Sequence, residues 1–246
     1  MKTAVIITAR LNSSRLPEKI LLPLNGKTVL EHLIDRALVT KVDEVILAIP
    51  NTEEHKKLAD IALAKGIKVY GGSLNDRLDR IYRAAEFYGI EAVASMDGDD
   101  PFCDPYLMEL GLRQLDELWL DAVTVSPEMI VGAFTLAVRT STLRKAVELK
   151  DGDVSEDLMQ YIRPITDRIS FLDVEDKIYY DDSYRLTLDY PEDLEFFKAV
   201  FEWMDKEPTM VSLKSIITVL NYGNPNIKEI NAFRRQNWID NKVGMK

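Results

Sequence analysis

The first forty residues combine a continuous apolar run, a loop rich in positive charge and an amphipathic helix. Residues 4–7 are Ala-Val-Ile-Ile, the pattern of a parallel strand that is covered on both faces. Apolar side chains recur along one side of residues 28–38, which predicts a helix. The loop after the first strand of an α/β sheet is a common ligand site. This order predicts an α/β fold with a binding site between the two elements.

Strand-like and helix-like segments continue to alternate. We expect Gly71 and Gly72 to end the third strand, because glycine weakens strand interiors. Such alternation is typical of a three-layer α/β/α sandwich. The further strands are predicted over residues 44–50, 67–70 and 92–96, and the further helices over residues 53–65, 75–88 and 105–118.

No repeat, low-complexity stretch or Pro/Gly/Ser-rich linker divides the chain, so we expect a single domain over residues 1–246. Residues 121–180 are less regular, which predicts an excursion from the main sheet, such as a dimerisation arm. The chain from residue 208 onward is predicted to form a small helical appendix with a turn at residues 224–226.

Charge and cysteine content exclude several classes of protein. The chain has 31 Lys and Arg against 41 Asp and Glu, a net charge of −10, which argues against a nucleic-acid partner. The single Cys103 excludes an internal disulfide and fits a reducing compartment, where we expect it to be a packed thiol. No apolar run of about 18 residues is present, which argues against membrane insertion. We therefore expect a cytoplasmic protein.

Other common catalytic signals are weak or missing in the sequence. The two histidines, His32 and His55, both fall within predicted helices, which argues against a catalytic triad or a zinc site. His55 stands in a run of charged residues and is expected to face the solvent. No G-x-G-x-x-G motif follows a strand, which argues against a nicotinamide or flavin enzyme.

The loop after the first predicted strand carries Arg10, Arg15 and Lys19, together with the hydroxyls of Ser13 and Ser14. Arginine binds two phosphate oxygens in a fork, and lysine supplies a mobile point charge. Such groups stabilise a triphosphate and the charge on a leaving pyrophosphate. The alternative is a solvated basic turn. The position after the first strand, in an acidic chain, favours phosphate binding.

Two acidic clusters follow other predicted strands. Asp97 and Asp99 flank a glycine at the end of the fourth strand, an arrangement suited to Mg²⁺, although a polar turn is the alternative. Residues 185–188 are predicted to form a strand that ends at Asp189, which gives a second carboxylate to share the metal with Asp99. The next two acidic residues, Glu192 and Asp193, are interpreted mainly as helix-dipole residues.

Several motifs stand in a fixed order over nearly the whole chain. They are Ala9-Arg10 with Ser13, Arg15-Leu16-Pro17 and Lys19; Gly26-Lys27 with Leu30-Glu31-His32; Leu78-Asp79-Arg80 with Tyr82; Gly98-Asp99-x-Pro101 with Asp104-Pro105; Leu188-Asp189-x-Pro191-Glu192-Asp193-Leu194; and Asn224-Pro225 with Glu229-Ile230-Asn231. In this order they resemble the SpsF-like cytidylyltransferases, which are related to the CMP-KDO and CMP-sialic acid synthetases.

The resemblance implies a Rossmann-like, glycosyltransferase-A-like fold with a mixed, mostly parallel sheet. It implies transfer of CMP from CTP to a sugar acid or phosphorylated acceptor, with release of pyrophosphate, in surface polysaccharide or glycoconjugate biosynthesis. It also implies a homodimer. By the same likeness, the catalytic residues are Arg10, Arg15 and Lys19, the nucleotide-binding residues are Ala9, Arg10, Ser13, Lys19, Asp79 and Arg80, and the Mg²⁺ ligands are Asp99 and Asp189.

The chain departs from the family pattern at two loop positions. Asn12 and Glu18 stand where relatives usually carry glycine, which alone adopts positive φ at no steric cost. Two alternatives therefore stay open: a catalytically weakened nucleotide-binding relative that acts as a regulatory or partner module, and an enzyme that joins another nucleoside triphosphate to a sugar phosphate. The general base also stays open, with Asp97 as a candidate. Residues 131–134 and 155–157 are expected near the acceptor.

Overall fold

Strands and helices alternate along the chain, and the computed structural model describes residues 1–181, 183–204 and 212–234. The strands are β1 (Thr3–Thr8), β2 (Pro23–Leu24), β3 (Lys27–Thr28), β4 (Glu44–Pro50), β5 (Lys68–Gly72), β6 (Ala92–Asp97), β7 (Ala122–Thr124), β8 (Leu136–Arg139) and β9 (Ile169–Phe171). The α-helices are α1 (Val29–Leu38), α2 (Lys56–Ala64), α3 (Arg77–Phe87), α4 (Pro105–Glu117), α5 (Thr140–Leu149), α6 (Met159–Ile162), α7 (Pro191–Trp203) and α8 (Leu213–Tyr222). Short 3-10 helices are η1 (Lys19–Leu21), η2 (Glu53–His55), η3 (Arg163–Ile165), η4 (Lys177–Tyr179) and η6 (Pro225–Ile230).

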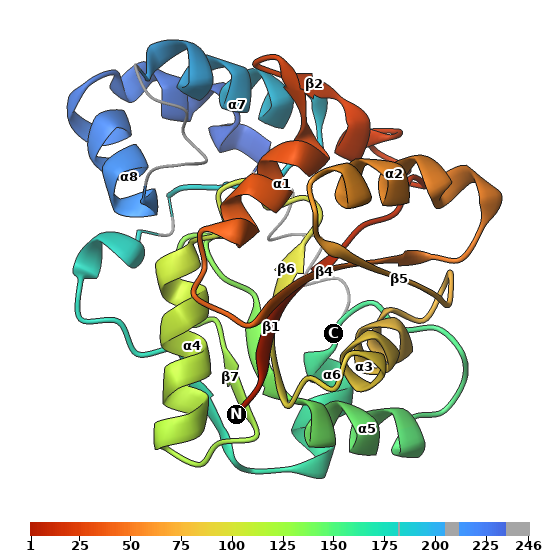
Figure 1. Ribbon diagram of the computed structural model, residues 1–246. Coiled ribbons are helices and arrows are strands. Elements are labelled where there is room, and N and C mark those ends of the chain that lie inside the picture. The colour runs from red at the N-terminus through yellow and green to blue at the C-terminus, as the bar shows by residue number, and fades with distance from the viewer. Residues whose placement is uncertain (182, 205–211, 235–246) are drawn as a thin grey trace.

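Seven of the strands form one twisted sheet in the order β5-β4-β1-β6-β8-β7-β9 (Figure 1). The strands β5, β4, β1 and β6 are parallel, whereas β8 is antiparallel to both of its neighbours. In register, Thr8 at the end of β1 pairs with Ala48 of β4 and with Asp97 of β6. The loops that follow β1 and β6 therefore start side by side, at one edge of the sheet.

Helices cover both faces of this sheet, which confirms the three-layer sandwich with a mixed, mostly parallel sheet (Figure 1). One apolar core lies between the sheet and α1, α2 and α4, and it continues under α7 and α8. The second core lies between the sheet and α3, α5 and α6. Helix α1 begins at a capping box in which Thr28 and Glu31 satisfy each other's backbone N–H groups. The start of α1 is thus set by residues that are close together in the sequence.

Three sequence expectations need correction. Strand β5 continues through Gly71 and Gly72, which pair with Ile49 and Pro50 of β4, so the glycines do not end it. Residues 121–180 supply β7, β8 and β9 to the main sheet and are no excursion from it. Residues 185–188 form no regular strand, because the N–H groups of Leu186 and Leu188 donate to loop carbonyls, those of Val131 and Asp99.

The predicted helical appendix is present in its described part. Helix α8 and the 3-10 helix η6 pack together beside α7 at one end of the molecule (Figure 1). The predicted turn at residues 224–226 coincides with the start of η6. The predicted appendix also includes residues 208–211 and 235–246, which lie outside the described residues.

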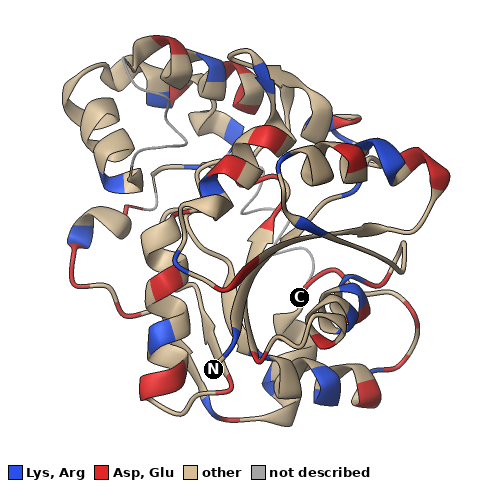
Figure 2. Ribbon diagram, in the orientation of Figure 1, with Lys and Arg blue, Asp and Glu red and all other residues tan. Residues whose placement is uncertain are grey.

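Charged residues lie mostly on the helices and connecting loops, with both signs interspersed, while the central strands are largely uncharged (Figure 2). Among the helices of the described part, a stretch with the length and hydrophobicity needed to traverse a bilayer is absent. One group of charges lies at the end of a central strand: Asp97 is the last residue of β6, and Asp99 and Asp100 follow it.

Candidate active site

A cavity of about 350 Å³ opens at the carboxyl edge of the sheet, where the loops after β1 and β6 start side by side. It is lined by Thr8, Ala9, Arg10, Asn12, Ser13, Ser14, Arg15, Lys19, Ile20, Leu74, Asn75, Arg77, Arg80, Asp97, Gly98, Asp99, Ser155, Glu156 and Asp189. Of the nine residues to which the family resemblance assigns a catalytic, nucleotide-binding or metal-binding role, eight therefore lie around one cavity. These are Ala9, Arg10, Ser13, Arg15, Lys19, Arg80, Asp99 and Asp189.

Asp79 is the predicted site residue that the cavity does not include. Its N–H group is capped by the carboxylate of Asp76 at the start of α3, and its own carboxylate accepts a hydrogen bond from Arg83 Nε at 3.2 Å. Asp76 is the N-cap residue of α3 and Arg83 lies on the same helix, so both contacts are local. Asp79 directly precedes the cavity-lining Arg80, and its side chain therefore leaves α3 in a different direction and has different neighbours.

The loop between β1 and η1 is closed by hydrogen bonds to the Leu11 carbonyl, which accepts from Ser13 N at 3.0 Å and Glu18 N at 3.2 Å. Glu18 adopts a left-handed conformation, with φ of 52°, whereas Asn12 does not have a positive φ. Of the two departures from glycine, only Glu18 therefore strains the backbone.

Replacing Glu18 with glycine is expected to stabilise the protein by about 0.5–1 kcal/mol, because relief of the left-handed conformation exceeds the entropic cost of glycine. The ion pair that Glu18 forms with Lys57 is exposed and contributes little. Urea unfolding measures the effect, with Asn12→Gly as the matched control, which should give no gain. Equal shifts in the two variants would contradict the assignment of strain to Glu18.

Lys19 bridges the two acidic clusters. Its Nζ lies 2.8 Å from Oδ2 of Asp99 and 3.0 Å from Oδ1 of Asp189, and its side chain is only 14% exposed. Burial alone would lower the pKa of Lys19, but the two carboxylates outweigh burial and raise it. Lys19 is therefore a permanent cation between the carboxylates that the sequence assigned to a metal.

Asp189 is held by three cations and is nearly inaccessible. Its Oδ1 also accepts from Arg15 Nη2 at 2.9 Å, and its Oδ2 accepts from Arg185 Nη2 at 2.7 Å. Both oxygens of Asp189 thus have charged donors, so the position of this carboxylate is firmly fixed.

Sequence reasoning missed the buried network behind Asp189. Arg185 is almost fully buried, and its Nη1 donates to Asp193 Oδ1 at 2.5 Å. Asp193 also accepts from Asn231 Nδ2 at 3.0 Å and from the backbone N–H groups of Asp189 and Tyr190, each at 2.8 Å. Asp193 does support the start of α7, where it accepts from the N-cap Tyr190, but the interpretation was incomplete, because Asp193 is also the buried counter-ion of Arg185.

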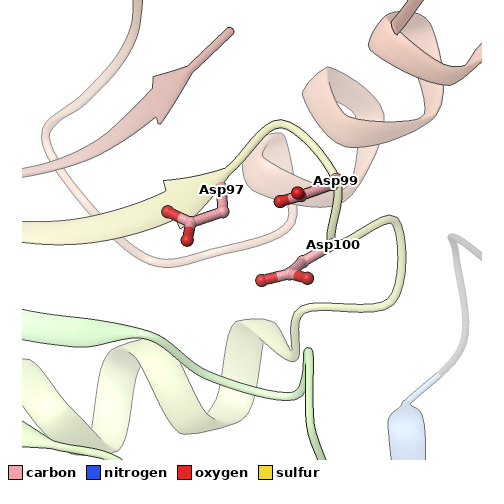
Figure 3. Close-up of side chains that lie close together, drawn as sticks. All are labelled: Asp97, Asp99 and Asp100. Carbon is pink, nitrogen blue, oxygen red and sulfur yellow. The ribbon is translucent and has the colours of Figure 1, made fainter. Parts of the chain in front are cut away.

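Asp97, Asp99 and Asp100 gather at the end of β6 and in the loop that follows (Figure 3). Each offers a carboxylate oxygen within 4.8 Å of the others. Gly98 allows this turn, because a Cβ there would lie 2.6 Å from the carbonyl oxygen of Thr8. The loop after β6 therefore packs directly on the end of β1, where the cationic loop begins.

The three carboxyl groups differ in the direction in which their pKa is shifted. Burial raises the pKa of Asp97, although its ion pair with Arg77 opposes the rise. For Asp99, burial is outweighed by the charge of Lys19, and its pKa is lowered. Burial and the nearby charges of Asp99 and Asp97 raise the pKa of Asp100 well above its ordinary value. Asp99 is therefore the member of the cluster with the most strongly favoured negative charge.

A second group of cations lies on the α3 side of the cavity. Arg10 Nη1 lies 2.7 Å from Glu156 Oε1, and Arg77 Nη1 donates to the Glu156 carbonyl at 3.3 Å. Burial, with the charges of Arg77 and Arg10, lowers the pKa of Arg80 to about 10. Arg77 was missed by sequence reasoning, although it precedes Arg80 by three positions and so shares its helix face.

Two expected segments differ in their distance from the cavity. Ser155 and Glu156 line it, and Ser155 Oγ donates to Asp76 Oδ1 at 2.6 Å, which ties this segment to the start of α3. Residues 131–134 do not line it. Instead, the Val131 carbonyl accepts from Leu186 N at 2.8 Å and so supports the segment that leads to Asp189.

The predicted location is wrong for His55 and confirmed for Cys103. The prediction that His55 faces the solvent is wrong, because the side chain is completely buried between Thr52 and the peptide of Leu11. Cys103 is a buried free thiol, as predicted, and burial raises its pKa well above the ordinary value.

Comparisons with known proteins identify the family of the chain. The family model described as cytidylyltransferase matches residues 4–217. The chain is 29% identical over 225 residues to the spore coat polysaccharide biosynthesis protein SpsF of Bacillus subtilis. The alignment covers 88% of this chain and 92% of the relative.

Solved structures with the same fold include a cytidylyltransferase from Leptospira borgpetersenii serovar Hardjo-bovis. It has a TM-score of 0.83 at 26% identity and covers 92% of this chain and 96% of that structure. CMP:2-keto-3-deoxy-manno-octonic acid synthetase complexed with CTP has a TM-score of 0.65 at 21% identity, covers 82% of this chain and 99% of that structure, and shows the shared fold alone. The chain belongs to the cytidylyltransferase family and is a nucleotidyltransferase.

Proposed function

We propose that the protein transfers CMP from CTP to a sugar acid or phosphorylated acceptor and releases pyrophosphate, in a Mg²⁺-dependent reaction of surface polysaccharide or glycoconjugate biosynthesis. The observation that carries the proposal is the meeting of Arg10, Arg15 and Lys19 with Asp99 and Asp189 around one cavity. The similarity to a spore coat polysaccharide biosynthesis protein supports the pathway class.

The three cations of the loop after β1 are proposed to bind the triphosphate. A triphosphate carries about four negative charges, and Arg and Lys donors at close range stabilise both it and the leaving pyrophosphate. In the structure these cations are paired with carboxylates: Lys19 with Asp99 and Asp189, Arg15 with Asp189, and Arg10 with Glu156. Binding of CTP would therefore exchange carboxylate partners for phosphate partners.

Asp99 and Asp189 are proposed to hold Mg²⁺. Carboxylate oxygens are the ligands that this ion prefers, and both groups contact the same cation, the ammonium of Lys19. The donor set therefore fits a divalent cation. When bound, the ion would neutralise phosphate charge and orient the α-phosphate for attack. Lys19 would then be released from its two carboxylates to contact the phosphates.

Ala9, Ser13 and Arg80 are proposed to contact the nucleotide. Arg80 is buried, its Nη1 donates to the Ser73 carbonyl at 2.5 Å, and its Nε has no hydrogen-bond partner among the described residues. Such a donor at the cavity wall favours an acceptor-rich ligand. Asp79 was grouped with these residues, but its carboxylate is engaged by Arg83, so any role of Asp79 would be indirect.

Asp97 remains the candidate general base. It lines the cavity, and its raised pKa moves it toward the range in which a carboxylate accepts a proton effectively. An acceptor that arrives as an anion would need no base. An Asp97→Asn variant with full activity would remove the base role. A homodimer and a cytoplasmic location complete the proposal.

Removal of divalent metal by EDTA is expected to abolish turnover, and added Mg²⁺ is expected to restore it. Asp99→Asn should lose at least about 10²-fold in kcat at any Mg²⁺ concentration, because it removes a ligand and a partner of Lys19. Asp116→Asn, which changes a carboxylate remote from the cavity lining, is the matched control. Turnover that persists in EDTA, or in Asp99→Asn, would overturn the metal assignment.

The acceptor is found by measuring pyrophosphate release with CTP and Mg²⁺ in the presence of sugar acids, sugar phosphates and small phosphorylated metabolites. Release with CTP and one acceptor class supports the proposal and names the class. Release with another nucleoside triphosphate and a sugar phosphate would favour the rival enzyme. Binding of CTP without release with any acceptor would favour the catalytically weakened relative.

A further inference from the structure

His55 lies at the end of η2, more than forty residues along the chain from the loop that follows β1, yet its side chain is buried against that loop. We propose that His55 is a positioning residue, whose neutral imidazole holds the Leu11 peptide and thereby sets the loop that presents Arg10, Arg15 and Lys19 to the triphosphate. This inference rests on the proposed function for its consequences in nucleotide binding, whereas its geometry comes from the structure alone.

The hydrogen bonds of the ring define its tautomer. Nε2 lies 3.2 Å from Leu11 N, and because a backbone N–H only donates, Nε2 must accept and carry no proton. The proton is therefore on Nδ1, which lies 2.6 Å from Thr52 Oγ1 and donates to it. His55 N also donates to the Thr52 carbonyl at 3.1 Å. The imidazole is thus fixed on one side by Thr52 and fixes Leu11 on the other.

The Leu11 peptide is a central point of the loop. Its N–H is held by His55, and its carbonyl accepts from both Ser13 N and Glu18 N. These bonds close the segment between Arg10 and Lys19 into a compact turn. Loss of the His55 acceptor would leave a buried N–H group unsatisfied at this point, so the loop would have to shift to find another partner.

Charges around His55 make its protonation costly. Burial lowers its pKa below the ordinary 6.5; the nearby Glu54 opposes this, whereas Arg80 and Lys57 lower the pKa further. Protonation would also place a hydrogen on Nε2 opposite the Leu11 N–H, so two donors would face each other. Because the folded pKa is lowered, the contribution of His55 is complete above about pH 6.5 and is lost as the pH falls through the folded value.

Two variants separate the hydrogen bond that His55 accepts from Leu11 N from the protonation of the imidazole. His55→Gln keeps an acceptor oxygen near the place of Nε2 but cannot titrate, and His55→Leu has no acceptor. Calorimetry with CTP and Mg²⁺ at about pH 7.5 should show binding about 10-fold weaker in His55→Leu and within about threefold of wild type in His55→Gln. A folded His55→Leu variant that binds CTP as tightly as wild type would overturn the proposal.

The pH dependence provides the decisive comparison if His55→Leu does not fold. The terminal phosphate of CTP titrates near pH 6 as well, so the measured quantity is the ratio of the wild-type and His55→Gln dissociation constants. Between about pH 7.5 and a pH below the His55 pKa found by NMR titration, wild type should lose more affinity than His55→Gln. Identical acid dependence in the two proteins would contradict the proposed role.

A measurement without nucleotide distinguishes failure of this inference from failure of the proposed function. The sequence has two histidines, so NMR titration with His55→Gln assigns the His55 resonance. We expect His55 to titrate below 6.5 and the Leu11 amide to be protected from exchange in wild type and in His55→Gln, with protection reduced in His55→Leu. If wild type binds no CTP, the proposed function fails, and Leu11 protection alone decides whether His55 positions the loop.

Discussion

Replacing Lys19 with methionine is expected to lower kcat/KM for CTP by about 10²–10³. Methionine keeps most of the length of the side chain but removes the ammonium that lies 2.8 Å from Asp99 and 3.0 Å from Asp189. The triphosphate would lose a charge-assisted donor in a largely buried position, and the two carboxylates would lose the cation that they share. Steady-state pyrophosphate release, measured with an acceptor found by the screen described above, gives the effect.

Lys57→Met is the matched control for this substitution. Lys57 forms an exposed ion pair with Glu18 and does not line the cavity, so its loss should change kcat/KM by less than about twofold. A Lys19→Met enzyme with near wild-type kcat/KM would contradict the role of Lys19 in phosphate binding. So would a loss of similar size in both variants.

Replacing Asp193 with alanine is expected to cost about 3–5 kcal/mol of unfolding free energy. Asp193 is completely buried and pairs with the buried Arg185, so its loss leaves a guanidinium without one of its two counter-ions. The backbone N–H groups of Asp189 and Tyr190 would also lose their acceptor. Urea unfolding followed by circular dichroism measures the change.

Glu192→Ala removes the neighbouring carboxylate and serves as the control. Glu192 pairs with Arg234 near the surface, so its loss should change stability little. A loss of stability in Asp193→Ala no larger than in Glu192→Ala would contradict the network. In a folded Asp193→Ala variant, activity should also fall, because Asp189 loses the support that positions it.

The first half of the fold follows from local sequence signals. Strands β1 and β4 contain unbroken apolar runs, β6 is apolar apart from Ser95 and the terminal Asp97, and helices such as α1 and α4 begin at strong capping residues. Strands β7, β8 and β9 have only three or four residues each, too few for a periodic pattern. Their place in the sheet is set by pairing with distant segments, which a local pattern does not contain.

In the candidate site, too, some residues were predictable from the local sequence, whereas contacts between distant segments were not. Arg10, Arg15 and Lys19 were predictable because they share one loop at the end of a strand. The supporting contacts were not: His55 reaches Leu11 across 44 positions, and Asn231 reaches Arg185 across 46. Each contact depends on how distant segments of the chain pack together. The charged residues next to His55 in the sequence led to the wrong prediction that His55 faces the solvent. Residues that line the cavity were thus easier to predict than the residues that hold them in place.

The most direct test of the account is the thermal stability of the protein with Mg²⁺ and each of CTP, UTP, ATP and GTP. A ligand at 100 times its dissociation constant adds about 2.7 kcal/mol of stability, which raises the melting temperature of a domain of this size by roughly 5–10 °C. We predict a rise in melting temperature that is selective for CTP and is lost without Mg²⁺. An equal rise with all four nucleotides, or no rise with CTP, would contradict it.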